Sequence, residues 1–290
     1  MLQRILRKSA RLARRWRANG GAGADSFADA PFVYPWLNAL CEDFFDDDSR
    51  MRPAYLWGAL HAAHLAKTLE IPAISLIEFG VAGGNGLVAL DLIAQRIERT
   101  LHIRTSVYGF DTGEGLPEPR DLRDCPNLFT RGGFPMAVDD LQKRLVRAKL
   151  VLGAVEDTLP DVVDDLRTSP VAFVSFDLDY YSSTKAALRL LDFDASMFLP
   201  RVHCYFDDIT GFTYSDYNGE RLAISEFNCE HSQRKISPIY GLRHYVPQGF
   251  ADSLWVEKYF MAHLLDHELY GEPDGLVRQQ RMDLPKERRS

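Results

Sequence analysis

Four aspartates directly follow two short apolar runs of the sequence. Asp177 and Asp179 come after VAFVSF, and Asp207 and Asp208 come after VHCYF. Both runs have the length and composition of strands buried inside a parallel sheet. Because the carboxyl ends of neighbouring parallel strands form the ligand crevice of an open sheet, we expect these carboxylates to lie close together.

Such a cluster predicts a bound cation, because carboxylates held side by side repel each other unless a positive charge lies between them. Mg²⁺ binds oxygen ligands and keeps several waters or substrate oxygens around it. We therefore predict a divalent-cation site at the ends of these two strands. In the alternative interpretation, Asp179 caps a helix and Asp208 is an ordinary loop residue.

A glycine-rich segment supplies a second chemical feature. The apolar run ISLI leads into Glu78, and four glycines follow within seven positions: Gly80, Gly83, Gly84 and Gly86. Glycines allow a sharp turn and a close approach of the backbone to a ligand, and the helix expected after them begins with free N–H groups. The order of strand, glycine turn and helix indicates a nucleotide-binding βαβ unit.

The position of the acid favours one cofactor. Glu78 precedes the first glycine by two residues, and the pattern E-x-G-x-x-x-G-x-G resembles motif I of class I S-adenosylmethionine-dependent methyltransferases. We accordingly expect Glu78, Gly80, Gly84 and Gly86 to contribute to the cofactor site. A dinucleotide site is the alternative, because GNGLVA fits G-x-G-x-x-A, although Arg104 stands where such a site needs its acid.

Three further acidic residues extend the predicted cofactor site. Asp111 ends the run TSVYGF, where a carboxylate can accept hydrogen bonds from the ribose hydroxyls. Glu156 and Asp157 follow LVLGAV and could meet the amino group of adenine. Alternatively, Asp111 or Asp157 caps a following helix.

These residues require alternating strands and helices to position them. Apolar runs predict strands at 74–78, 105–110, 171–176 and 202–206 and one beginning at Leu150. Helical spacing is found at 54–69, 87–97, 139–149 and 185–191. Residues 120–136 have neither pattern and are expected to form a lid or a long surface loop. The alternation indicates an α/β fold.

Taken together, the motifs resemble one family, the macrocin-type O-methyltransferases of antibiotic-sugar biosynthesis (the TylF/MycF group). The likeness covers roughly residues 75–230. It is carried by EFGVAGGNG at 78–86, FDTGEGLPEP at 110–119, GAVEDTLP at 153–160, DLDYYSSTKAAL at 177–188 and FDDITG at 206–211. The chain departs from the family at Gly113, where a bulky aromatic residue is usual, and at 192–200, which lacks a glycine pair.

The resemblance implies a doubly wound, mostly parallel seven-stranded sheet with an N-terminal helical extension. It also implies S-adenosylmethionine as cofactor and a Mg²⁺ ion held by Asp177, Asp207 and Asp208, so that Asp177 counts as catalytic too. The expected reaction is O-methylation of a hydroxyl on a sugar-like or polyhydroxylated small molecule or glycan, with the cation lowering the pKa of that hydroxyl. The general base would be Asp179 or a histidine outside the motifs, such as His203.

Composition excludes several classes of protein. The hydrophobic fraction of 46% and the aromatic fraction of 11% fit a globular protein with a full core. Seven Lys and Arg residues fall among the first 17, which leaves a net charge of −14 on the remainder and argues against nucleic-acid binding. No apolar run has transmembrane length. The four cysteines form no C-x-x-C pair, which indicates reduced thiols in a cytoplasmic setting.

Three regions are expected along the chain. They are a basic amphipathic arm and linker at 1–24, a methyltransferase domain at 25–270, and a charged tail at 271–290. The domain is divided into a helical cap at 25–69, a cofactor and metal core at 70–230 and a C-terminal part at 231–270. Residues 1–18 could lie on an anionic membrane surface or an acidic partner, or be a frayed terminus. The domain could also form a homo-oligomer.

Two other functions are compatible with the same motifs. An NAD-dependent oxidoreductase would bind NAD and would not depend on a metal ion. A non-catalytic cofactor-binding module, recruited by its basic arm, would not need the aspartates.

Overall fold

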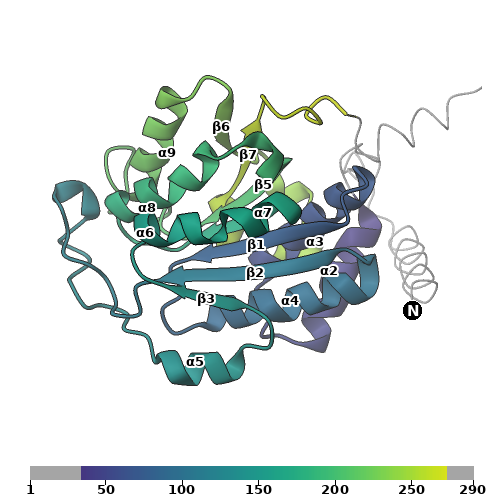
Figure 1. The fold of residues 1–290 in the computed structure, drawn as a ribbon, viewed down its shortest axis with the longest axis horizontal. Coiled ribbons are helices and arrows are strands. Elements are labelled where there is room, and N and C mark those ends of the chain that lie inside the picture. The colour runs from purple at the N-terminus through teal and green to yellow at the C-terminus, as the bar shows by residue number, and fades with distance from the viewer. Residues whose placement is uncertain (1–33, 273–290) are drawn as a thin grey trace, which may run out of the picture.

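The computed structural model describes residues 34–272, so the expectations for the basic arm and most of the charged tail concern residues outside it. Helices and strands alternate through most of this part (Figure 1). The helices are α2 Pro35–Asp47, α3 Pro53–Thr68, α4 Asn85–Leu101, α5 Val138–Arg144, α6 Val155–Thr158, α7 Val163–Thr168, α8 Tyr181–Leu188 and α9 Gly219–Glu230. The strands are β1 Ala73–Phe79, β2 Arg104–Asp111, β3 Lys149–Leu152, β4 Val171–Phe176, β5 Phe198–Phe206, β6 Arg234–Pro238 and β7 Tyr259–Leu264.

All seven strands form one sheet in the order β3-β2-β1-β4-β5-β7-β6. Strands β1 to β5 pair in parallel, and β7 pairs antiparallel with both β5 and β6. The predicted doubly wound, mostly parallel seven-stranded sheet is therefore confirmed. The strand order reverses direction at β1, so the crevice at its carboxyl end is the position where such folds bind ligands.

Strand β1 is buried along its whole length because helices cover both faces of the sheet. Its side chains alternate between two cores. Ile74 and Leu76 belong to the core that includes α2, α3 and α4, whereas Ile77 and Phe79 belong to the core beneath α6, α7, α8 and α9. Figure 1 shows these two groups of helices on opposite sides of the sheet.

Among the helix boundaries that differ from the predicted ones are the end of α5 and the start of α8. Helix α5 ends at Arg144, five residues before the expected end, because the chain turns into β3. The buried Asp91 carboxylate fixes that turn by accepting hydrogen bonds from the N–H groups of Val146 and Arg147 at 2.6 and 3.1 Å. Helix α8 begins at Tyr181, four residues earlier than predicted, so it follows the acidic segment after β4 almost directly.

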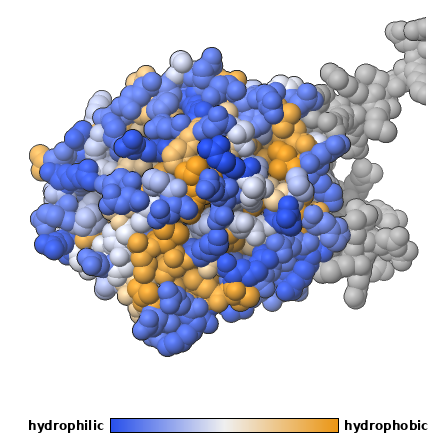
Figure 2. Space-filling model, viewed as in Figure 1, coloured by the Kyte–Doolittle hydropathy of each residue, from blue (hydrophilic) through white to orange (hydrophobic). Residues whose placement is uncertain are grey.

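The face seen in Figure 2 is mostly hydrophilic, with a hydrophobic area near α5 and the edge strand β3, where Val146 and Leu152 are exposed. The four cysteines are all free, and Cys229 alone among them is exposed. Between residues 34 and 272 no helix is both long and apolar enough to span a membrane.

Candidate functional site

A cavity of about 550 Å³ lies at the carboxyl ends of β1 to β5. This volume is within the range of small-molecule sites. It is lined by the segments that follow these five strands, among them the loop of residues 112–136 after β2. The cavity therefore occupies the crevice that the sheet topology predicts as the ligand site.

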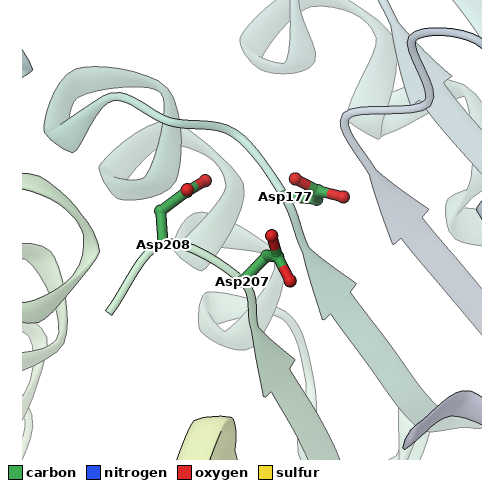
Figure 3. Close-up of side chains that lie close together, drawn as sticks. All are labelled: Asp177, Asp207 and Asp208. Atoms are coloured by element: carbon green, nitrogen blue, oxygen red, sulfur yellow. The ribbon is translucent and has the colours of Figure 1, made fainter. Parts of the chain in front are cut away.

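Asp177, Asp207 and Asp208 gather at one end of this cavity. Each offers a carboxylate oxygen that lies within 4.8 Å of those of the other two. Figure 3 shows the three side chains converging just beyond the ends of β4 and β5. The predicted meeting of the carboxylates at neighbouring strand ends is thus found in the structure.

Hydrogen bonds hold these carboxylates in place. Asp207 Oδ1 accepts from the Tyr205 hydroxyl at 2.7 Å and from Lys258 Nζ at 3.1 Å. Asp208 Oδ1 accepts from the Tyr214 hydroxyl at 2.9 Å, and its own backbone N–H donates to Glu220. A buried carboxylate with satisfied partners keeps one orientation, which a ligand site needs.

Electrostatic repulsion within the cluster is strong. Burial and the neighbouring charges of Asp207 and Asp208 raise the pKa of Asp177 to about 7. Burial and Asp207 likewise raise the pKa of Asp208. Two cations lie close by, Lys258 against Asp207 and the Arg52 guanidinium 3.8 Å from Asp177. All the candidate metal ligands in the cluster are carboxylate oxygens, the type that Mg²⁺ binds, so these three residues fit a divalent cation.

Asp179 lines the cavity beside the cluster. Its backbone has a φ of 61°, which is uncommon outside glycine, and its N–H donates to Asp208 Oδ2 at 3.1 Å. The alternative in which Asp179 caps α8 is wrong, because Tyr180 is the N-cap residue. Burial and the charge of Asp208 raise the pKa of Asp179. Within residues 34–272 its carboxylate accepts no hydrogen bond, so it is available to a ligand.

The glycine turn contributes less to the cavity than the motif predicted. Gly80 and Ala82 line it, whereas Gly84 and Gly86 do not. A Cβ at Gly84 would lie 2.2 Å from the Leu141 side chain, and one at Gly86 would lie 1.8 Å from Glu78 Oε1. These two glycines therefore make room for the protein's own side chains.

Glu78 does not reach the cavity either, because it points into the core beneath α3. Only 1% of it is exposed, and Oε1 accepts a hydrogen bond from the Tyr55 hydroxyl at 2.7 Å. The same hydroxyl accepts from Ser175 Oγ at 2.7 Å and from Arg52 at 3.2 Å. Burial raises the pKa of Glu78 to about 8. The expected direct contact between Glu78 and a cofactor is therefore corrected to a structural position behind the glycine turn.

Asp111 stands at the cavity wall as predicted, at the end of β2. Its Oδ2 accepts hydrogen bonds from the N–H groups of Val81 and Ala82, both at 2.9 Å, and its Oδ1 accepts from Gly113 at 2.7 Å. Asp111 caps no helix in the described chain; it joins the β1 turn to the loop after β2. Each carboxylate oxygen has two lone pairs, so Oδ1 can still accept a bond from a ligand hydroxyl.

Glu156 and Asp157, predicted as a pair, lie in different surroundings. Both lie in the first turn of α6, but Glu156 lines the cavity and pairs with Arg120 at 3.1 Å, whereas Asp157 is exposed and does not line it. Ala154, not Asp157, is the N-cap residue of this helix.

His203 lies in the middle of β5 and does not line the cavity. Its ring packs against Trp57 and Tyr259 in the core, and 5% of the residue is exposed. Burial lowers its pKa well below the usual range. The expectation that His203 serves as a general base is therefore wrong, because it reaches no ligand in this cavity.

Four residues at or near the cavity were not expected from the sequence: Arg52, Asp124, Tyr214 and Lys258. Lys258 is 51 residues from its partner Asp207, and Asp124 is 58 residues from its partner Ser182. No local pattern marks such residues, because their partners are brought to them by the tertiary fold.

No family model matches the sequence, and no curated protein matches it. Among solved structures, the chain is similar to the calicheamicin methyltransferase CalS11, with 22% identity, coverage of 77% of this chain and 95% of that one, and a TM-score of 0.49. It is also similar to the O-methyltransferase NovP, with 17% identity, coverage of 61% and 72%, and a TM-score of 0.42.

A third similar structure is the MycE methyltransferase of the mycinamycin biosynthetic pathway, in complex with Mg, SAH and mycinamycin VI. Here the identity is 14%, the coverage is 78% of this chain and 54% of that one, and the TM-score is 0.34. These three similar structures are all of methyltransferases.

Proposed function

We propose that this chain is an S-adenosylmethionine-dependent, Mg²⁺-assisted O-methyltransferase acting on a hydroxyl of a sugar-like or polyhydroxylated small molecule or glycan. One observation carries the proposal. A single cavity is lined both by the turn after β1 with Asp111 and by the Asp177, Asp207 and Asp208 cluster. A nucleoside-type cofactor and a metal-bound acceptor would therefore meet in one cavity.

The cofactor would lie against the turn after β1, where Gly80 and Ala82 leave the cavity open. Asp111 would accept a hydrogen bond from a ribose hydroxyl, and Glu156 would lie near the adenine ring. S-adenosylmethionine would supply an electrophilic methyl group, which the acceptor oxygen takes as the bond between methyl carbon and sulfur breaks.

The metal would be held by Asp177, Asp207 and Asp208, and its chemistry is to lower the pKa of a hydroxyl beside it. Tyr205 and Lys258 donate to Asp207 Oδ1, and Asp207 Oδ2 accepts no hydrogen bond from the described residues. Tyr214, six residues further along the same loop, donates to Asp208 Oδ1 in the same way.

Asp179 would take the proton from the acceptor hydroxyl at one of its carboxylate oxygens. It lines the cavity next to the cluster, and its raised pKa suits a group that accepts a proton near neutral pH. The loop of residues 112–136 would exclude water from the reacting groups and so keep them aligned. The acceptor ether and the demethylated cofactor are the products.

Thermal unfolding tests the proposal. We expect S-adenosylmethionine and S-adenosylhomocysteine to raise the midpoint, because a ligand at 100 times its dissociation constant adds about 2.7 kcal/mol, or several degrees in a domain of this size. Mg²⁺ should add a further shift that EDTA removes. Asp207→Asn should keep the shift from the sulfur-containing cofactors and lose the shift from Mg²⁺.

Three outcomes would contradict the proposal. A shift with NAD alone would identify an oxidoreductase. No shift with any cofactor would favour a module without catalysis. An Mg²⁺ shift that persists in Asp207→Asn would place the cation elsewhere. Asp216→Asn is the matched control, because Asp216 is an exposed aspartate paired with Arg221 and lies outside the cavity.

A further inference from the structure

Asp124 is an unusual residue in the loop of residues 112–136. Most of the residues around it are exposed, but Asp124 itself is 0% exposed. It ends the short 3₁₀ helix Leu122–Asp124. In residues 34–272 no cation lies within ion-pair distance of its carboxylate, so hydrogen bonds must compensate for its burial.

Three hydrogen bonds do so. Asp124 Oδ1 accepts from the Ser182 backbone N–H at 2.8 Å, and Oδ2 accepts from the Ser182 hydroxyl at 2.9 Å and from the Arg120 backbone N–H at 2.8 Å. Ser182 is in the first turn of α8, whose N-cap residue Tyr180 makes no side-chain capping bond. Asp124 therefore caps α8 from a distant part of the chain, where its negative charge also favours the helix dipole.

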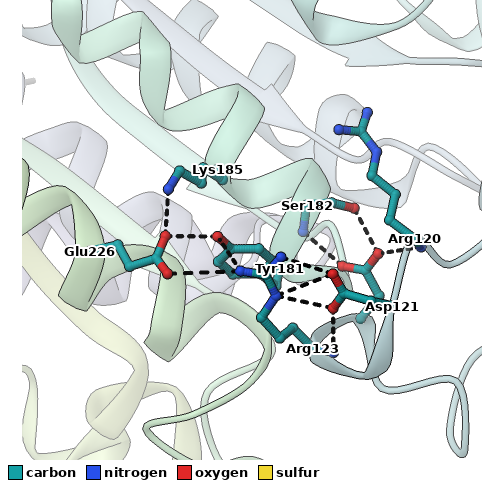
Figure 4. A network of polar contacts seen from close by, with 8 residues as sticks. Arg120, Asp121, Arg123, Tyr181, Ser182, Lys185 and Glu226 are labelled. Carbon is teal, nitrogen blue, oxygen red and sulfur yellow. Dashed lines mark hydrogen bonds and ion pairs between the residues drawn. The ribbon is translucent and has the colours of Figure 1, made fainter.

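The neighbours of Asp124 strengthen the same contact. The Arg123 guanidinium lies over the Tyr181 ring at 4.3 Å and donates to its hydroxyl at 3.1 Å. The Tyr180 hydroxyl donates to the carbonyl oxygen of Pro117 at 3.3 Å. The N-cap residue Tyr180 and the first two residues of α8, Tyr181 and Ser182, thus all contact the loop. Figure 4 shows the polar contacts around Tyr181 and Ser182.

This contact joins two parts of the cavity lining. Leu116, Pro117 and Phe134 of the loop line the cavity, and so do Ser182 and Ser183 of α8. Helix α8 also follows directly on the segment that carries two of the candidate functional aspartates. A change in its first turn is therefore transmitted to that segment and to the loop together.

We infer that Asp124 is a positioning residue that closes the loop of residues 112–136 over the cavity by capping α8. Its effect on ligand binding rests on the proposed function, whereas its effect on the loop does not. Without its carboxylate, the loop loses both of its hydrogen bonds to Ser182, and the cavity opens along that side.

The experiment compares Asp124→Ala with Asp91→Ala. Asp91 is a matched control because it is also a buried aspartate that accepts two backbone hydrogen bonds, but it holds the turn after α5 and not the loop of residues 112–136. Limited trypsin digestion of the full chain, read by mass spectrometry, reports opening of the loop through cleavage after Arg120, Arg123 and Arg131. Calorimetry with S-adenosylhomocysteine measures how tightly this ligand binds in the cavity.

We expect Asp124→Ala to speed cleavage in the loop about tenfold, as the loss of a helix cap permits, and to weaken binding at least about fivefold. Asp91→Ala should lower thermal stability and leave both readouts within about twofold of wild type. Asp124→Asn should be intermediate, because its side-chain oxygen still accepts from Ser182 while the Arg120 N–H loses its partner.

Equal loop cleavage in Asp124→Ala and Asp91→Ala would overturn the inference, as would unchanged binding in Asp124→Ala. If Asp124→Ala does not fold, Asp124→Asn and Ser182→Ala take its place against the same control. If the wild-type chain does not bind S-adenosylhomocysteine, the proposed function fails, and the cleavage rates alone decide whether Asp124 closes the loop.

Discussion

Replacing Glu78 by Gln tests whether this residue is a buried structural group. Glu78 is 1% exposed and accepts a hydrogen bond from Tyr55, and its second oxygen has no partner in the described structure. Glutamine has the same shape and can accept the same bond. Protonated glutamate and glutamine also both place a hydrogen-bond donor at the position of Oε2, which has no partner. The two side chains should therefore give the fold about the same free energy of unfolding.

The pH dependence follows from the raised pKa. Burial raises the pKa of Glu78 from 4.5 to about 8 in the folded chain. Its stabilising contribution is therefore fully present below pH 4.5 and is lost as the pH rises to 8, because the unfolded chain releases this proton first. At about 1.36 kcal/mol per pKa unit, the loss between pH 5 and pH 8 is about 3 kcal/mol.

Urea unfolding at several pH values between 5 and 8 measures this difference. We expect Glu78→Gln to match wild type at pH 5 and to be more stable by about 3 kcal/mol at pH 8. Asp177, whose pKa is raised to about 7, also titrates in this range, but it is present in both proteins.

Glu98→Gln is the control, because its effect should have the opposite sign. Burial raises the pKa of Glu98, but hydrogen bonds from Arg147 and Thr105 outweigh it and hold that pKa below the usual range. Glu98→Gln should thus be less stable than wild type at pH 8 and approach it as the pH falls through the pKa of Glu98. A Glu78→Gln variant that is no more stable than wild type at pH 8 would refute the buried position of Glu78.

Two further predictions concern packing and the metal site. Gly58→Ala should destabilise the fold by about 1–3 kcal/mol, because a Cβ there would lie 1.5 Å from the Tyr259 hydroxyl oxygen, and Tyr259→Phe should reduce that cost in urea unfolding. If the effects of Gly58→Ala and Tyr259→Phe on the free energy of unfolding simply add, this contact is contradicted. Lys258→Met should tighten Mg²⁺ binding several-fold in calorimetry, because Lys258 Nζ lies 3.1 Å from Asp207 and repels a second cation. Weaker binding would contradict this, and would show that the lost hydrogen bond to Asp207 matters more than the repulsion.

The aspartate cluster was the part of the site that sequence reasoning predicted best. Asp177 and Asp207 each follow a run of buried strand residues, and parallel strands that are neighbours in a sheet end at the same edge. Their proximity therefore required only that β4 and β5 pair, which a right-handed crossover through α8 makes the expected arrangement.

The position of the glycine turn was predicted correctly, but the direction of the Glu78 side chain was not. A pattern of spacings says that Glu78 and Gly86 lie near the turn, but it does not say which way the side chain of Glu78 points. Strand alternation places Glu78 on the same face as Ile74 and Leu76, towards α3, where the Tyr55 hydroxyl donates a hydrogen bond to it. Because Tyr55 comes from a different helix, that partner was not visible locally.

The sequence by itself determined the first five strands, the glycine turn and the acidic strand ends, because each is set by residues within a few positions of one another. Only the tertiary structure decided that His203 is in the core, that Lys258 reaches Asp207, and that Asp124 caps α8. The physical reason is distance along the chain. A contact between residues 50 or more positions apart depends on how whole elements pack, and that packing has no local pattern in the sequence.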